Sequence, residues 1–155
     1  MGVTGVRIRV KICGITRPEW ARAAPAAGAD AVGLIFAESP RRVGPKEAAG
    51  IIDALPPWVA PVGVFVDTPP ADVRDLADRL RLAAVQLHGD EPPETLADVG
   101  SAKIIKALGV DSEADLDAAR RWRDAAEAAG RTPDAYLVDA RVAGGPKGGT
   151  GQTAD

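Results

Sequence analysis

Cysteine, aromatic side chains and long apolar runs are all scarce in this chain of 155 residues. The single cysteine, Cys13, rules out an internal disulfide and fits a protein that works in a reducing compartment. No apolar run approaches the roughly 18–20 residues that span a bilayer, and the first ten residues lack the apolar core of a signal peptide. We therefore predict a soluble, cytoplasmic protein with no membrane partner.

An excess of basic residues is also missing. Lys and Arg total 19 against 22 Asp and Glu, and no basic block or interleaving of basic and aromatic residues occurs. This balance argues against a nucleic-acid partner. No cluster has convincing metal-ligand spacing, and no Ser-His-Asp arrangement can be assigned. The sequence therefore predicts neither a metal site nor a cofactor.

Six short apolar runs are present, each rich in Val, Ile or Leu and bounded by Gly, Pro or Asp. This pattern predicts buried strands. Their starts lie roughly 20–30 residues apart, which leaves room for one helix and two short loops in each interval. The predicted strands cover residues 6–13, 29–36, 60–66, 83–87, 103–108 and 135–139.

The segments between these runs carry helix signals. We expect Thr16 to cap the first helix and Gly28 to close it, with Pro25 ending or kinking it early. Ser112-x-x-Asp115 predicts a capping box at the start of the longest helix. The other predicted helices cover residues 45–55, 70–80 and 91–99, and the longest covers residues 111–129.

Strict alternation of strands and helices predicts one α/β domain with a parallel sheet. An open doubly wound sheet and a (β/α)8 barrel both fit this alternation. No G-x-G-x-x-G motif follows the first strand, where CGITRP stands instead, and this counts against a dinucleotide-binding sheet. The later stretch GGPKGGTG lacks the G-K-[ST] ending of a P-loop. We expect the strands to lie side by side in chain order, in a curved sheet.

The carboxyl ends of parallel strands usually carry the chemistry of such folds. Each candidate there has an ordinary alternative, because a free cysteine often packs in a core, a loop arginine is usually solvated, and a carboxylate can cap a turn. Together, however, a thiol and a carboxyl group could act as base and acid on a small substrate, and an arginine could hold its anionic group. The candidates are Cys13, the SPRR run at 39–42, Asp67, His88 with Asp90 and Glu91, Lys106 and Asp139.

Several motifs occur together in one order. They are KICGIT, GADAVGLIF followed by SPRRV, VGVFVD, VQLHGDE, IKALGV, and LVD followed by GGTGQT. This set resembles the phosphoribosylanthranilate isomerase (TrpF) family of tryptophan biosynthesis over essentially the whole chain. The resemblance implies a (βα)8 TIM barrel of the ribulose-phosphate-binding type. It also implies a cofactor-free aldose–ketose isomerase, which converts N-(5-phosphoribosyl)anthranilate to 1-(2-carboxyphenylamino)-1-deoxyribulose 5-phosphate by an Amadori rearrangement.

The resemblance also implies a role for particular residues. Cys13 of KICG would be the general base, and Asp139 of YLVD would be the general acid. Arg41 of SPR would engage the anthranilate part of the substrate, and His88 of QLHG would line the same pocket. A thiol is mostly protonated near neutral pH, so we hypothesise that Lys11, on the same strand face as Cys13, favours the thiolate.

The glycine-rich stretch at 148–151 completes the implied site. Gly148 and Gly149 are expected to contact the phosphosugar–anthranilate substrate. In this barrel type the substrate phosphate is held by the loops after strands seven and eight. The resemblance implies that residues 1–155 form a single incomplete barrel domain that contains only the first six strands.

Three functions stay open on these grounds. The first is the isomerase itself. The second is an inactive barrel fragment that associates with a partner chain, or with itself, through the open edges of strands one and six. The third is a related sugar-phosphate isomerase or lyase, against which the pairing of KICG with SPRR argues.

Overall fold

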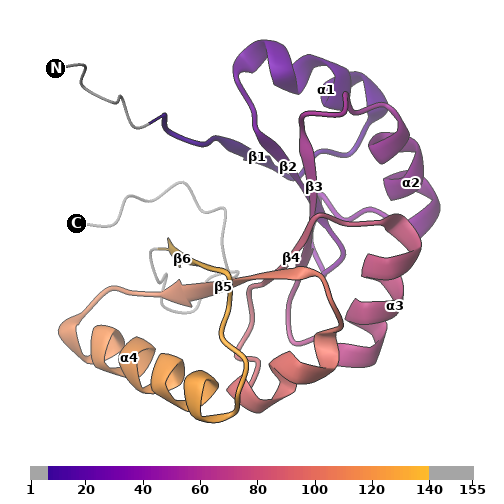
Figure 1. The fold of residues 1–155 in the computed structure, drawn as a ribbon. Coiled ribbons are helices and arrows are strands. Elements are labelled where there is room, and N and C mark those ends of the chain that lie inside the picture. Colours follow the sequence, from indigo (N-terminus) through magenta and orange to yellow (C-terminus); the bar gives the residue numbers. More distant parts are fainter. Residues whose placement is uncertain (1–6, 140–155) are drawn as a thin grey trace, which may run out of the picture.

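The computed structural model describes residues 7–139, which form a curved parallel sheet with helices on its convex side (Figure 1). Neighbouring strands are hydrogen-bonded in the order β1-β2-β3-β4-β5-β6. This confirms the predicted order and excludes the strand reversal of a doubly wound sheet. The strands are β1 (Lys11–Cys13), β2 (Ala31–Ile35), β3 (Ala60–Phe65), β4 (Ala84–Leu87), β5 (Lys103–Gly109) and β6 (Ala135–Asp139).

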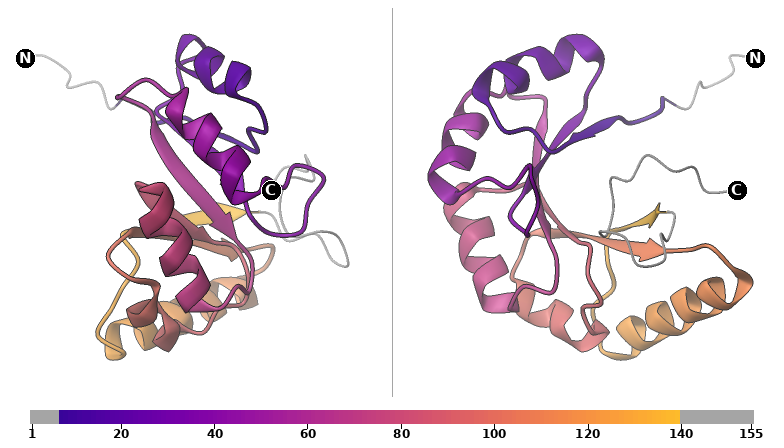
Figure 2. Two further views of the ribbon diagram at one scale, coloured as in Figure 1. Left: turned by 90° about the vertical axis from the view of Figure 1, so that its right-hand side faces the viewer. Right: turned by 180° about the vertical axis from the view of Figure 1, so that it is seen from behind.

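Helices fill the connections between the strands, and the view from behind in Figure 2 again places them outside the curve of the sheet. Proline occupies the first turn of α1, α2 and α3, where its fixed φ suits a helix start and its missing N–H costs nothing. The α-helices are α1 (Pro18–Ala23), α2 (Pro45–Asp53), α3 (Pro70–Leu80) and α4 (Glu113–Ala128), and the 3-10 helices are η1 (Ala24–Ala27) and η2 (Pro93–Val99).

Two predicted helix ends are confirmed. The Ser112 hydroxyl accepts a hydrogen bond from the backbone N–H of Asp115 (3.2 Å) and donates to its carboxylate (2.7 Å), which caps α4 as predicted. The first helix ends early, at Ala23, and is followed by η1, which contains Pro25 and is closed by Gly28 in the left-handed conformation (φ 83°).

Three local predictions were wrong. Thr16 does not cap α1, because Pro18 sets the first helical residue and so places Arg17 at the N-cap, without a side-chain bond. The predicted helix at 91–99 is instead the 3-10 helix η2, which covers Pro93–Val99. The first strand is shorter than residues 6–13, because the Val10 N–H donates to the Asp30 carboxylate (2.9 Å) instead of to a neighbouring strand.

The two faces of the sheet have different surroundings. Ile12, Val32, Leu34, Val85 and Ile104 pack against the helices in two apolar clusters. Because side chains alternate along a strand, the residues between them face the concave side.

The register of the strands shows which residues of neighbouring strands point to the same face. Cys13 lies beside Gly33, and Gly109 beside Asp139. Cys13 and Asp139 therefore share the concave face, one at the carboxyl end of each edge strand of the described sheet.

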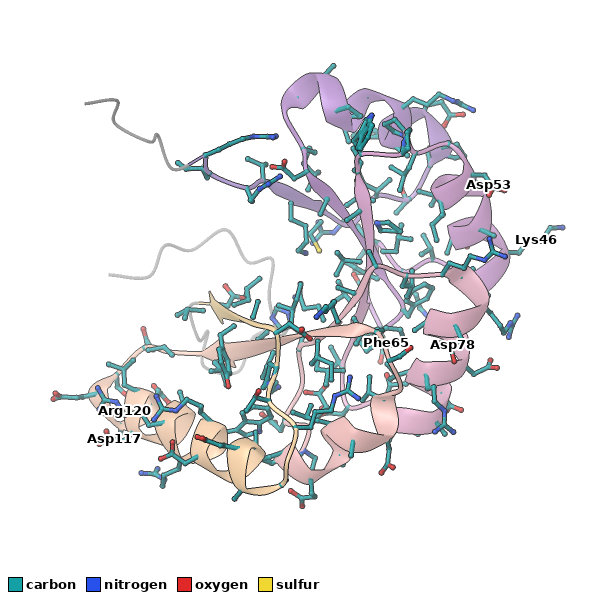
Figure 3. All side chains as sticks on the ribbon, viewed as in Figure 1. Lys46, Asp53, Phe65, Asp78, Asp117 and Arg120 are labelled. Carbon is teal, nitrogen blue, oxygen red and sulfur yellow. The ribbon has the colours of Figure 1, made fainter. Side chains whose placement is uncertain are left out.

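Charged side chains cover the outside of the helices. In Figure 3 the labelled residues of α2, α3 and α4 extend away from the sheet, whereas Phe65 lies in the core between the sheet and the helices. The outward residues are Lys46, Asp53, Asp78, Asp117 and Arg120. Within residues 7–139 no helix is long and apolar enough to cross a membrane.

Candidate active site

Cys13 ends β1, and its thiol lies over a glycine of the neighbouring strand. A Cβ atom added at Gly33 would come within 2.7 Å of Cys13 Sγ and 3.1 Å of Lys11 Nζ. The absence of a side chain at Gly33 therefore makes room for both groups. Cys13 Sγ and Lys11 Nζ therefore both lie close to this Cβ position, and the distance between them cannot exceed the sum of 2.7 and 3.1 Å. This geometry agrees with the hypothesis that Lys11 acts on Cys13.

Arg41 comes from the loop after β2 and crosses the end of β1. Its Nη1 donates to the carbonyl oxygen of Cys13 (3.0 Å), and its backbone N–H donates to Ser39 Oγ (3.1 Å). Gly14 permits this approach in two ways: it has a positive φ (85°), and a Cβ there would lie 2.7 Å from Nη1. The exposed guanidinium is therefore held beside Cys13, where it could bind an anionic group.

His88 and Asp139 form a second pair on the concave face. His88 directly follows β4, and its backbone N–H donates to Phe65 O (2.8 Å), which continues the strand ladder. His88 Nε2 lies 3.3 Å from Asp139 Oδ2, and the two side chains are 16% and 34% exposed. Burial lowers the pKa of His88 below its ordinary value and outweighs the raising effect of Asp139. His88 is therefore neutral at neutral pH.

Gln86 is a site residue that the sequence reasoning missed. Its side chain is 2% exposed, and its Nε2 lies 2.6 Å from His88 Nδ1. A usable signal was present, because Gln86 is a polar residue inside the apolar run at 83–87 and lies two positions before His88. Period-two alternation places these two residues on one strand face.

Lys106, Glu91 and Asp67 were candidates at predicted strand ends, but the structure places Lys106 in the middle of β5 and gives the three a different role. Lys106 pairs with Leu87 in the sheet register, which places it on the helix-facing side. There its Nζ bonds Glu91 Oε2 (2.8 Å) with both side chains buried, and Glu91 Oε1 accepts the Asp67 N–H (3.0 Å). These residues instead hold the β4–η2 loop against β5. Their role is therefore the ordinary structural one.

The structure thus gathers four of the six predicted site residues into two contacting pairs on one face. Arg41 contacts Cys13, and His88 contacts Asp139. The positive charge of Lys11, which lies beside Cys13 Sγ, adds to the effect of burial in lowering the pKa of His88. The other two, Gly148 and Gly149, lie outside the described residues.

This arrangement offers a thiol, a carboxyl group, a neutral imidazole and two cations around the concave side of the sheet. Thiols and carboxyl groups move protons to and from carbon and oxygen, and the cations can hold an anionic substrate. Residues 7–139 contain no group of three or more His, Cys, Asp or Glu side chains that could hold a metal ion. The site is suited to acid–base chemistry on a small anion.

Comparison with known proteins decides the family. Residues 10–155 match the profile of N-(5'phosphoribosyl)anthranilate (PRA) isomerase. The chain belongs to this family. The N-(5'-phosphoribosyl)anthranilate isomerase of Geobacter sulfurreducens is 51% identical over 149 residues, which cover 94% of this chain and 67% of that protein. That of Rubrobacter xylanophilus is 46% identical over 150 residues, covering 95% and 68%.

Solved structures of the PRA isomerase family agree with this assignment. The Thermotoga maritima phosphoribosyl anthranilate isomerase is 40% identical and superimposes with a TM-score of 0.81, covering 96% of this chain and 68% of that chain. A family member in complex with reduced 1-(o-carboxyphenylamino)-1-deoxyribulose 5-phosphate gives a TM-score of 0.76 at 41% identity, covering 87% and 66%. The predicted TIM-barrel class is thereby confirmed. The chain spans about two thirds of the length of these relatives.

Proposed function

We propose that this chain supplies the acid–base machinery of a phosphoribosylanthranilate isomerase, with N-(5'-phosphoribosyl)anthranilate as its substrate. The observation that carries the proposal is the position of Cys13 and Asp139 on one concave face, at the carboxyl ends of the two edge strands. Membership of the PRA isomerase family supports the choice of substrate. The cytoplasmic location stays a prediction from the sequence.

The reaction needs an acid first. Asp139, protonated, donates its proton to the furanose ring oxygen, and the C1′–O bond breaks as the nitrogen lone pair forms a C=N bond. The Asp139 carboxylate that results is close to His88 (Nε2 to Oδ2, 3.3 Å). A nearby donor stabilises negative charge as it forms.

A base then completes the hydrogen shift. The Cys13 thiolate removes the proton from C2′, and the electron pair of that C–H bond forms the enolamine and neutralises the nitrogen. The enolamine tautomerises to the ketone product. Lys11 places its ammonium beside Sγ over Gly33, close to the sulfur that takes the proton. Arg41, held to the Cys13 carbonyl, binds the carboxylate of the anthranilate.

The remaining substrate contacts belong to other parts of the barrel. We propose that residues 1–155 contribute the first six strands of a (βα)8 barrel, that Gly148 and Gly149 contact the phosphosugar–anthranilate substrate, and that loops after strands seven and eight hold its phosphate. Binding of the remote phosphate would then supply energy used at the reacting carbon atoms. Turnover is therefore expected to depend on the segments that hold the phosphate.

The experiment compares two proteins. One is this chain, and the other, which we call the joined protein, is this chain followed by the last third of the G. sulfurreducens relative. Each is incubated with N-(5'-phosphoribosyl)anthranilate, and the ribulose product is measured by chromatography. Product from the joined protein alone, or from both, supports the proposal. A folded joined protein that makes no product would overturn it.

A further inference from the structure

The amide of Gln86 is buried on the concave face with an incomplete set of partners. Its Nε2 lies 2.6 Å from His88 Nδ1, whereas its Oε1 is buried without a hydrogen-bond partner. An orphaned buried carbonyl destabilises a fold. An apolar residue of similar shape, such as Met, would avoid this cost if Gln86 served only to pack. Its bond to His88 therefore calls for an explanation beyond packing.

That contact bears on which ring nitrogen of His88 carries the proton. An amide NH2 group only donates, so Nδ1 must accept, and a neutral imidazole then keeps its single proton on Nε2. Nε2 lies 3.3 Å from Asp139 Oδ2. We propose that Gln86 is a positioning residue, which fixes His88 as the Nε2–H tautomer so that this N–H faces the carboxyl group of Asp139.

The consequence follows from the proposed function, on which this inference rests. Asp139 becomes a carboxylate when it gives its proton to the substrate. An Nε2–H already aimed at Oδ2 strengthens its hydrogen bond as that charge develops, and no reorientation is needed during the reaction. With the proton on Nδ1, a nitrogen lone pair would face the new carboxylate and oppose the step.

Other charges around His88 also affect its pKa. Lys106 and Lys11 both lower its pKa, whereas Asp139 raises it. None of these charges selects one ring nitrogen by direct contact with Nδ1. Among the described contacts of the imidazole, Gln86 is the one at Nδ1, and Asp139 is the one at Nε2.

The test uses a favourable feature of the sequence. His88 is the only histidine among the 155 residues, so a long-range 1H–15N correlation spectrum of the chain contains a single imidazole. At mildly alkaline pH we expect Nδ1 to resonate as an unprotonated nitrogen and Nε2 as a protonated one. A spectrum with the proton on Nδ1, or an even mixture, would overturn the proposal without any variant.

Variants then isolate the cause. Gln86→Met removes the donor and should shift the two 15N resonances toward each other while thermal stability is retained or raised. Gln86→Glu presents an acceptor to Nδ1 and should move the proton to that nitrogen. Ile105→Met is the control, because Ile105 is the register partner of Gln86 on β5 and makes no such bond.

The outcomes separate this inference from the proposed function. An Nε2–H signal that persists in Gln86→Met would show that another group sets the tautomer, and the inference would fail. The spectra do not depend on turnover. The expected spectra together with an inactive joined protein would leave the positioning by Gln86 standing and overturn the isomerase assignment instead.

Discussion

At the scale of single residues, Lys11 is the cation that bears most directly on the reactivity of Cys13. Its Nζ and Cys13 Sγ both border the space above Gly33, where no side chain separates them. An ammonium close to a thiol favours the thiolate, which is the nucleophilic and basic form. Arg41 adds positive charge at the carbonyl of Cys13.

We predict that Lys11→Met slows alkylation of Cys13 by iodoacetamide near neutral pH, because the positive charge beside Sγ is removed. Cys13 is the only cysteine, so the measured rate belongs to one thiol. Lys46→Met is the matched control, since Lys46 extends into solvent from α2 (Figure 3). Equal rates for Lys11→Met and the unchanged chain would show that Lys11 does not act on the thiol.

Because of His88, the free energy of unfolding is expected to fall when the pH is lowered. Its folded-state pKa is lowered, mainly by burial, below the ordinary value of 6.5. The unfolded chain therefore binds this proton more readily, so the free energy of unfolding falls as pH drops from 6.5 through the folded pKa. Above 6.5 this contribution is fully present.

We predict that His88→Asn weakens this dependence. Urea denaturation of both proteins, from above pH 6.5 to well below it, would measure the change in the free energy of unfolding. The unchanged chain should lose more stability over this range than the variant. Equal losses would mean that the proton on His88 is not coupled to folding.

At the scale of elements, the ion pair of Lys106 with Glu91 fixes the β4–η2 loop against β5. The two side chains are 2% and 7% exposed, and Lys106 Nζ also donates to Gly89 O (2.6 Å). Trp122 of α4 contributes a ring 5.6 Å from Nζ and donates its indole N–H to Glu91 O (3.0 Å). The pair thus connects β5, the loop and α4.

We predict that Lys106→Met lowers the free energy of unfolding by about 3–5 kcal/mol, because Glu91 stays buried without its partner. Adding Glu91→Gln should recover part of the loss. The control is Lys103→Met, which removes an exposed pair with Asp134 and should cost less than about 1 kcal/mol. Equal losses for Lys106→Met and Lys103→Met in urea denaturation would contradict this account.

The sequence predicted the positions of the strands and helices better than their exact ends and side-chain contacts. Apolar runs and prolines placed all six strands and the start of α3, because burial and fixed φ angles act locally. The start of β1 lies next to the bond from Val10 to Asp30, 20 residues away, and no local pattern reveals such a contact. The outward side of Lys106 and the bond of Gln86 to His88 became clear only when the sheet register was known.

The motifs proposed Cys13 and Asp139, and the predicted strand order already placed them at the ends of the two edge strands of one curved sheet. The sequence did not give the register of the strands, which decides which side chains share a face. The register and the strand order establish that both side chains share the concave face. The family resemblance assigned the roles of base and acid, and the structure established that the two side chains lie on the same face.

At the scale of the whole molecule, the two edges of the described sheet carry exposed apolar side chains. Val10 is 40% exposed beside β1, and Tyr136 and Val138 on β6 are 40% and 65% exposed. Unpaired edges with apolar residues favour pairing with another chain. Self-association therefore stays a prediction for this chain.

We predict that sedimentation velocity detects association of this chain that increases with concentration, and that Val138→Lys reduces it. Trp58→Lys is the control, because Trp58 is 90% exposed and lies between α2 and β3. A monomer at every concentration, or equal effects of the two variants, would contradict association through the β6 edge.

The most direct test of the central claim is the turnover number of the joined protein with Cys13→Ala and with Asp139→Asn. Loss of one acid or base typically costs about 100- to 10,000-fold in rate. We predict a loss in this range for each variant, mainly in kcat, whereas Arg41→Ala should also raise KM. A Cys13→Ala protein that keeps near-normal turnover would show that the thiol is structural and would contradict the account.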